Sequence, residues 1–195
     1  VKLVAARIVG AAVGSDLVDG PDRRFAICKN FCGALDVDSK FTNDEINLEC
    51  IKGVAGVARG VEARGGGEEG ARLFKWLFSR LNGIAKKGTG GKRMNVFKLY
   101  AALLGGDGDG DAGKKGGEDL VAPHAELVLG PLNRAITEGE ATRNATEEDL
   151  NFMKEVLQLV EDRVGTERFM GAYAKVKEAA REKRDRDVAG VWWQG

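Results

Sequence analysis

Residues 71–86 read ARLFKWLFSRLNGIAK, and this stretch decides the fold. Apolar side chains recur at every third or fourth position, namely Leu73, Leu77, Leu81 and Ile84, flanked by Phe74 and Phe78. Polar positions fall on the opposite side at the same period: Arg72, Lys75, Ser79, Asn82 and Lys86. This spacing is typical of an α-helix with one buried and one exposed face. We therefore expect an amphipathic helix over about residues 69–86.

Helical periodicity also occurs on both sides of this stretch, and no segment predicts a convincing strand. The further helices are expected near 1–14, 22–35, 43–63, 92–104, 118–137, between Thr146 and Gly165, and near 167–187. The helix near 118–137 should be broken or kinked close to Pro123 and again close to Pro131. Thr146 with Asp149 predicts a helix cap. Gly53, Gly56 and Gly60 either weaken the helix near 43–63 or allow close packing against a neighbour.

These helices, joined by short connections, suggest antiparallel pairs. An isolated amphipathic helix cannot bury its apolar stripe, whereas stacked pairs can. We expect an all-α fold, a HEAT/armadillo-like α-solenoid of about four antiparallel helix pairs; a compact helical bundle is the alternative. The repeat region should cover 1–164 with a flexible Gly/Asp loop at 105–117, followed by a projecting basic helix at 165–187 and a non-native or disordered tail at 188–195.

The bulk composition limits the possible partners. Lys+Arg and Asp+Glu both total 30 among 195 residues, so an electrostatic partner must recognise a local patch. No apolar run reaches the roughly 20 residues of a membrane span.

Cys28, Cys32 and Cys50 are best interpreted as reduced thiols inside helices. Because the chain begins at Val1, within an amphipathic pattern, we expect it to be the C-terminal part of a longer protein.

A basic block extends from Ala71 to Gly106, where no acidic residue occurs. Its cationic residues are Arg72, Lys75, Arg80, Lys86, Lys87, Lys92, Arg93 and Lys98. Such a block on a neutral protein can contact phosphates, although a solvated face or a groove for an acidic protein would have the same pattern. Aromatic residues interleave with it (Phe74, Trp76, Phe78, Phe97 and Tyr100), and most are better explained as core than as stacking platforms.

The last expected helix changes character along its length. Its first part is amphipathic, with Phe169, Tyr173 and Val176 at helical spacing, and apolar residues are absent between Ala180 and Asp187. Its basic residues are Lys175, Lys177, Arg181, Lys183, Arg184 and Arg186, interspersed with acidic ones. A helix with this pattern leaves the body of the protein. RNA contact and a plain solvated extension are the two interpretations.

Motifs that resemble ion or nucleotide sites are incomplete. Asp107–Glu118 resembles an EF-hand loop, but Ala112 replaces the turn glycine and Lys114 the usual apolar residue, so a flexible insert is favoured. Gly88–Arg93 resembles a phosphate-binding loop without its first glycine or its Ser/Thr.

Metal and catalytic sites are equally incomplete. Cys28 and Cys32 could touch one metal, but Cys50 and His124 are the only further candidates for ligands, and neither has paired spacing. His124 has no obvious nucleophile or carboxylate partner. We therefore expect a binding protein and no enzyme, with no catalytic residue, cofactor or metal.

Several of these segments also resemble a known family. Residues 72–81 (RLFKWLFSRL), 84–86 (IAK), 96–98 (VFK) and 100–102 (YAA) are followed in order by 129–132 (LGPL) and 164–167 (VGTE), and then by Phe169, Tyr173, Lys175 and Val176. In this order they resemble the C-terminal region of the small-subunit processome component 20 family, large HEAT-repeat proteins associated with the U-three small nucleolar RNA. The resemblance covers about 1–187 and is densest in 72–101 and 150–186.

The resemblance implies a scaffold without enzymatic activity in the nucleolar precursor of the small ribosomal subunit. Its partners would be pre-ribosomal RNA, the U-three small nucleolar ribonucleoprotein and other processome assembly proteins, with no membrane and no small-molecule substrate. The family's terminal helix continues into a long basic tail, whereas this chain reads VAGVWWQG over 188–195. The Gly/Asp loop at 105–117 also resembles an insertion. An adaptor of the HEAT type that binds an acidic protein, with no RNA role, is the alternative function.

Overall fold

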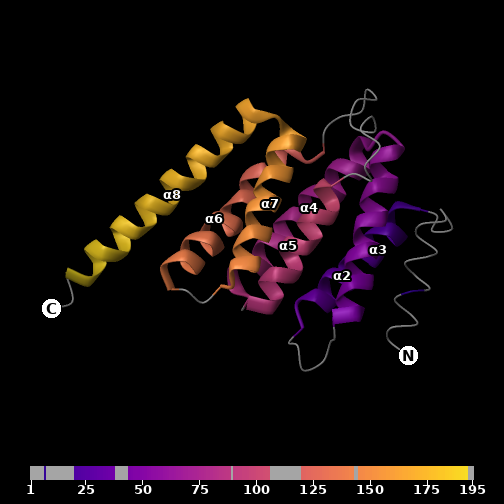
Figure 1. The fold of residues 1–195 in the computed structure, drawn as a ribbon. Coiled ribbons are helices and arrows are strands. Elements are labelled where there is room, and N and C mark those ends of the chain that lie inside the picture. Colours follow the sequence, from indigo (N-terminus) through magenta and orange to yellow (C-terminus); the bar gives the residue numbers. More distant parts are fainter. Residues whose placement is uncertain are drawn as a thin grey trace. The chain divides into compact units, whose positions relative to one another are not determined.

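The computed structural model describes residues 7, 20–37, 44–88, 90–105, 120–142 and 145–192, with side chains to Asp187. Within these residues it contains seven α-helices, one 3₁₀ helix and no strand, which confirms an all-helical fold (Figure 1). The helix expected near 1–14 and the loop expected at 105–117 lie outside the described residues, apart from Arg7 and Gly105. No helix in the described part of the chain has the length and apolar character needed to cross a bilayer.

The chain divides into two compact units, Val1–His124 and Ala125–Gly195. The first contains α2 (Pro21–Leu35), α3 (Asp44–Ala63), α4 (Gly67–Lys87), α5 (Gly90–Leu104) and the 3₁₀ helix η2 (Ala122–His124). The second contains α6 (Ala125–Thr142), α7 (Glu147–Val164) and α8 (Thr166–Trp192). This division differs from the boundary expected after Val164, because Phe169 near the start of α8 is buried and α8 contacts both α6 and α7.

The apolar stripe of α4 forms the centre of the first unit. Leu73, Leu77, Leu81 and Ile84 are each at most 2% exposed, as their spacing predicts. Phe78 lies against Tyr100 of α5 with ring centroids 6.1 Å apart. Burying each such side chain stabilises the fold by about 1.5 to 3 kcal/mol, so the stripe determines which side of α4 faces the interior.

Helices α2 and α3 meet through a close approach at Gly53. A methyl group at Gly53 would collide with the ring of Phe31, so glycine here permits packing, one of the two roles expected from sequence. Cys28, Cys32 and Cys50 are buried as free thiols in α2 and α3, which confirms that they lie inside helices. Burial raises the pKa of the Cys28 thiol to about 12, and it raises that of Cys50 to about 11 with help from Glu49.

The first helix of the second unit begins later than the helix expected near 118–137. Pro123 lies in η2 and α6 starts at Ala125, so the break expected near Pro123 is confirmed, whereas the helix expected from about 118 is wrong at Leu120 and Val121. Helix α6 then runs through Pro131 and is not broken there. Proline removes one helical hydrogen bond, but Pro131 is buried beside Val128, Leu129 and Leu132, whose packing holds the helix on both sides of it.

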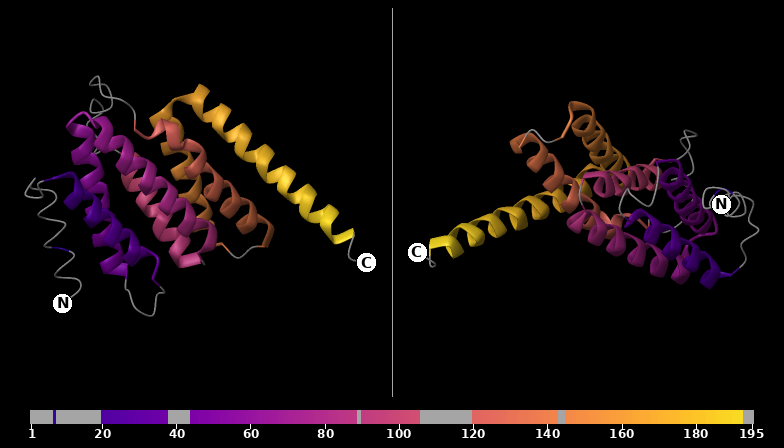
Figure 2. Two further views of the ribbon diagram at one scale, coloured as in Figure 1. Left: turned by 180° about the vertical axis from the view of Figure 1, so that it is seen from behind. Right: turned by 90° about the horizontal axis from the view of Figure 1, so that it is seen from below.

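Helix α7 begins with the predicted cap. The backbone N–H of Asp149 donates to Thr146 Oγ1 at 3.1 Å, and the Thr146 N–H donates to Asp149 Oδ2 at 3.3 Å. This reciprocal pair is a capping box. Gly165 ends α7 with a positive φ of 85°, as expected. Helix α8 is 27 residues long and extends five residues past Asp187, the expected end of the terminal helix (Figure 2).

Replacing Gly53 with alanine should lower the free energy of unfolding by about 1 to 3 kcal/mol, because the ring of Phe31 has to move. Gly83→Ala is the matched control, since a methyl group there meets nothing within 4 Å. It should stabilise α4 by up to about 1 kcal/mol through helix propensity. Urea denaturation of both variants measures the difference; equal effects of the two substitutions would contradict the Phe31 contact.

The hydroxyl of Tyr100 is buried and has no hydrogen-bond partner among the described residues. Since a buried polar group without a partner costs about 1 to 3 kcal/mol, Tyr100→Phe should leave stability unchanged or raise it by about 1 kcal/mol. Thermal unfolding of the variant tests this, and a clear loss of stability would show that the hydroxyl is bonded.

Candidate nucleic-acid interface

The outer face of α4 carries the first half of the basic block. Arg72, Lys75, Arg80, Lys86 and Lys87 are exposed, opposite the buried stripe. The sequence pattern predicted this face, with the exception of Asn82, which is half-buried with its Oδ1 in the interior. The local amphipathic pattern therefore places these five cationic side chains in solvent.

Helix α2 and its C-cap residue Asp36 add carboxylates to this basic face. Arg72 Nη2 lies 3.2 Å from Asp22 Oδ1, and Arg80 Nη2 lies 2.8 Å from Asp36 Oδ2. The surface around the block is therefore not of a single sign, although no acidic residue occurs within 71–106. The partners are 50 and 44 residues away along the chain, so a count over neighbouring residues could not include them.

The second half of the basic block is less accessible. Lys92 and Arg93 are half-buried in the first turn of α5, where Arg93 Nη2 donates to the carbonyl of Gly88 at 3.5 Å. These side chains help to close the turn between α4 and α5. Lys98 is exposed, while Phe97 and Leu99 on either side of it are buried. Among the described residues of the basic block, the exposed lysines without an ion pair are thus Lys75, Lys86, Lys87 and Lys98.

A bidentate ion pair between Arg24 and Glu69 links α2 to α4. Arg24 Nε donates to Glu69 Oε1 at 2.7 Å, and Arg24 Nη2 donates to Oε2 at 2.9 Å. Hydrogen bonding to Arg24, together with its charge, lowers the pKa of the Glu69 carboxyl. Two parallel charge-assisted bonds fix direction as well as distance, so this pair sets how α2 lies along α4.

The aromatic residues of the block divide into two groups. Phe74, Phe78, Phe97 and Tyr100 are buried, which confirms that most are core. Trp76 is half-buried on the outer side of α4, where its ring lies 4.9 Å from that of Phe25. The Arg72 guanidinium lies over the other aromatic of this pair, 5.4 Å from the centroid of Phe25. Phe25 was not expected on this surface from the sequence, because its contact with Trp76 joins two separate helices.

Helix α8 carries the second set of predicted contacts. All side chains from Arg181 to Asp187 are exposed, including Lys183, Arg184 and Arg186, as expected for a helix without apolar residues there. Lys175 pairs with Glu126 of α6 at 3.1 Å, and the ammonium of Lys177 lies 4.3 Å from the centroid of the Tyr173 ring. Arg181 lies 3.9 Å from Asp185 on the same helix. The basic charge of α8 is therefore partly balanced by its own acidic residues.

The remaining candidate sites suggested by the sequence are Gly88–Arg93, His124 and Asp107–Glu118. Gly88–Arg93 follows helix α4, with Thr89 outside the described residues, so the strand that precedes a phosphate-binding loop is replaced by a helix. His124 is half-buried with its ring 5.4 Å from that of Phe78; burial, and then the charge of Lys75, lower its pKa. Asp107–Glu118 lies outside the described residues. In the part of the chain that is described, no three His, Cys, Asp or Glu residues could hold a metal.

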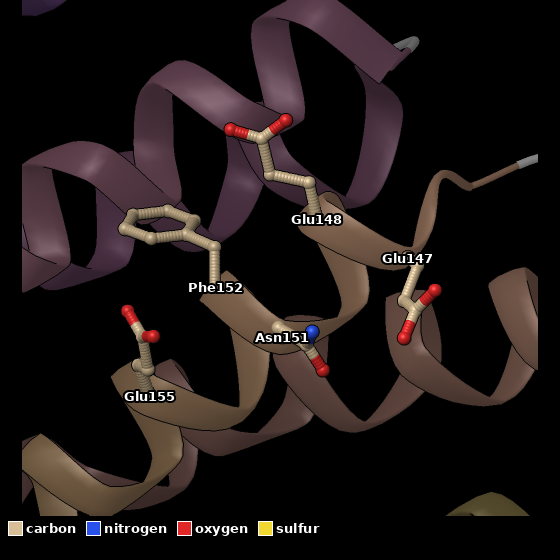
Figure 3. Close-up of a pocket in the computed structure, with 5 residues that line it drawn as sticks. All are labelled: Glu147, Glu148, Asn151, Phe152 and Glu155. Atoms are coloured by element: carbon tan, nitrogen blue, oxygen red, sulfur yellow. The ribbon is translucent and has the colours of Figure 1, made fainter.

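A shallow acidic depression lies on α7. It is lined by Glu147, Glu148, Asn151, Phe152 and Glu155, and Phe152 lies between the carboxylates of Glu148 and Glu155 (Figure 3). Acidic residues in the first turn of a helix stabilise it through its dipole. The position of Glu147 and Glu148 at the start of α7 is explained by this local effect.

Comparisons with protein-family models, with curated proteins and with solved structures find no match to this chain. The choice between functions therefore depends on the residues themselves. Among the described residues, the outer face of α4 combines five exposed cationic side chains with a half-buried aromatic ring.

Acidification should weaken the link between α2 and α4. Because the pKa of Glu69 is lowered in the folded protein, its stabilising contribution is full above the unfolded value of about 4.3 and is lost as the pH falls through the folded value. The free energy of unfolding should therefore fall less steeply between about pH 6 and about pH 3 in Glu69→Gln than in the wild type. Urea midpoints across this range measure it.

Glu68→Gln is the control for this experiment. Glu68 is the exposed neighbour on the same turn of α4, so its replacement should leave the pH profile of the wild type unchanged. Identical profiles for the wild type and Glu69→Gln would rule out a contribution from the Arg24 pair.

Proposed function

We propose that this chain is a non-enzymatic scaffold module that binds RNA in the small-subunit processome, the nucleolar precursor of the small ribosomal subunit. The observation that carries the proposal is the exposed basic face of α4, with Lys75, Lys86 and Lys87 unpaired within the described residues. Positive side chains on a rigid helix bind phosphates without sequence preference. The resemblance of residues 72–101 to the processome family gives the cellular setting.

A repeated two-helix arrangement would suit such a scaffold. Helices α2 and α4 run in the same direction, since Asp22 pairs with Arg72 and, further along both helices, Asp36 pairs with Arg80. Helix α3 contacts α5 as well, so each helix of the α2–α3 pair touches its counterpart in the α4–α5 pair. These contacts support an α-solenoid of antiparallel pairs, in which the outer helix faces are available to partners.

A binding role also fits the titratable groups with shifted pKa values. Cys28, Cys32 and Tyr100 have raised pKa values because they are buried in the core, and core packing accounts for their positions. Binding on an exposed helix face requires none of them, because the cationic side chains of α4 lie in solvent.

Reversing three charges tests the RNA role. Lys75→Glu/Lys86→Glu/Lys87→Glu should weaken binding to a single-stranded RNA oligonucleotide by about 10- to 100-fold and reduce the slope of log affinity against log salt by about 2. Arg93 is left in place because it bonds to the carbonyl of Gly88, so reversing it would disturb the turn. Circular dichroism should be unchanged, and fluorescence anisotropy measures the affinity.

Lys52→Glu is the control for charge reversal, because Lys52 lies on α3 and is paired with Glu49. It should bind RNA like the wild type. A poly-glutamate peptide tests the alternative adaptor function: binding of the peptide without RNA binding would favour an acidic protein partner. In cells, crosslinking that recovers no pre-ribosomal RNA would contradict the processome assignment.

A further inference from the structure

Trp76 lies between two arginines on the outer side of α4. Arg72, Trp76 and Arg80 follow each other at intervals of four residues, so they form one row along the helix. Successive members of such a row are about 6 Å apart along the helix axis. The row therefore alternates guanidinium, indole and guanidinium groups on one surface of the first unit.

Helix α2 holds every member of this row. Asp22 pairs with Arg72, Phe25 lies against Trp76, and Asp36 pairs with Arg80. The side chains of the row are therefore oriented before any partner arrives, which reduces the entropy lost on binding.

The two carboxylates leave the arginines able to bind a further anion. Each ion pair uses one terminal nitrogen of its arginine, whereas a guanidinium carries five N–H donors. The Arg72 side chain is 63% exposed and the Asp22 side chain 94% exposed, so solvent screens this pair. Lys29 is exposed on the same face of α2, one turn after Phe25, and adds positive charge beside the row.

We propose that Trp76 stacks on a base of single-stranded RNA, while Arg72 and Arg80 contact the phosphates on either side of that base. This inference rests on the proposed RNA-binding function and specifies its ligand and its residues. Alternation of basic and aromatic side chains is the arrangement with which proteins bind single strands. In a duplex the bases are stacked on each other and present no free face to the indole, so the row selects single strands.

Binding assays on the full chain test the stacking role. The probes are a 12-nucleotide single-stranded oligouridylate and a double-stranded RNA of the same length. Trp76→Ala and Trp76→Leu should each weaken binding of the single strand by about 5- to 100-fold, whereas Trp76→Phe should retain most of the affinity because its ring still stacks. Binding of the duplex should change less than about twofold in all three variants. Leucine tests packing without a ring, and circular dichroism establishes that each variant is folded.

Fluorescence gives a second measurement that needs no change at the site. In Trp192→Phe/Trp193→Phe, Trp76 is the only tryptophan left in the chain. The oligouridylate should quench its emission, and an abasic oligonucleotide of the same length and charge should not. Equal quenching by both, or by neither, would overturn the stacking role.

The outcomes separate this inference from the proposed function. If Trp76→Ala binds the single strand like the wild type while the triple lysine variant does not, RNA binding stands and the stacking site is wrong. If the wild type binds neither RNA probe, both proposals fail. If all Trp76 variants, including Trp76→Phe, lose single-strand and duplex binding equally, the tryptophan has a structural role and the inference is overturned.

Discussion

The burial of the apolar stripe of α4 is the constraint on which the first unit depends. Leu73, Leu77, Leu81 and Ile84 must leave water together, because they lie on one side of a rigid helix. Once that side faces the interior, the rotation of α4 about its axis is fixed. The opposite side, with Arg72, Lys75 and Lys86, then has to face solvent, so the basic surface is a consequence of the core.

The helical elements could be predicted from the sequence because their determinants are local. The stripe of α4 and the Thr146–Asp149 cap each depend on residues within a few turns of one another, so periodicity and capping rules identify them. Helix α6 shows the limit of such rules. Pro131 predicts an interruption, but burial between Val128 and Leu132 supplies long-range packing that a local rule does not include.

The candidate site was predictable only in part, because local rules do not include contacts between residues far apart in the sequence. The cationic residues of α4 and their exposure follow from the periodicity of that helix. Their pairing with Asp22 and Asp36, and the contact of Phe25 with Trp76, join segments far apart in the sequence. A charge count along the chain gives the sign of a segment, whereas the sign of a surface depends on which helices lie side by side.

A charge count along the chain does not describe what the carboxylates of Asp22 and Asp36 do on this surface. With a net charge of zero, the protein has no global field that attracts a polyanion, so the proposed RNA binding would depend on a local patch of side chains. Exposed ion pairs contribute about 0 to 1 kcal/mol to stability, which is too little to explain Asp22 and Asp36 as essential to the fold. They lie beside Arg72 and Arg80, in the same row as Trp76, while Lys75, Lys86 and Lys87, which have no ion pair within the described residues, supply the local positive charge.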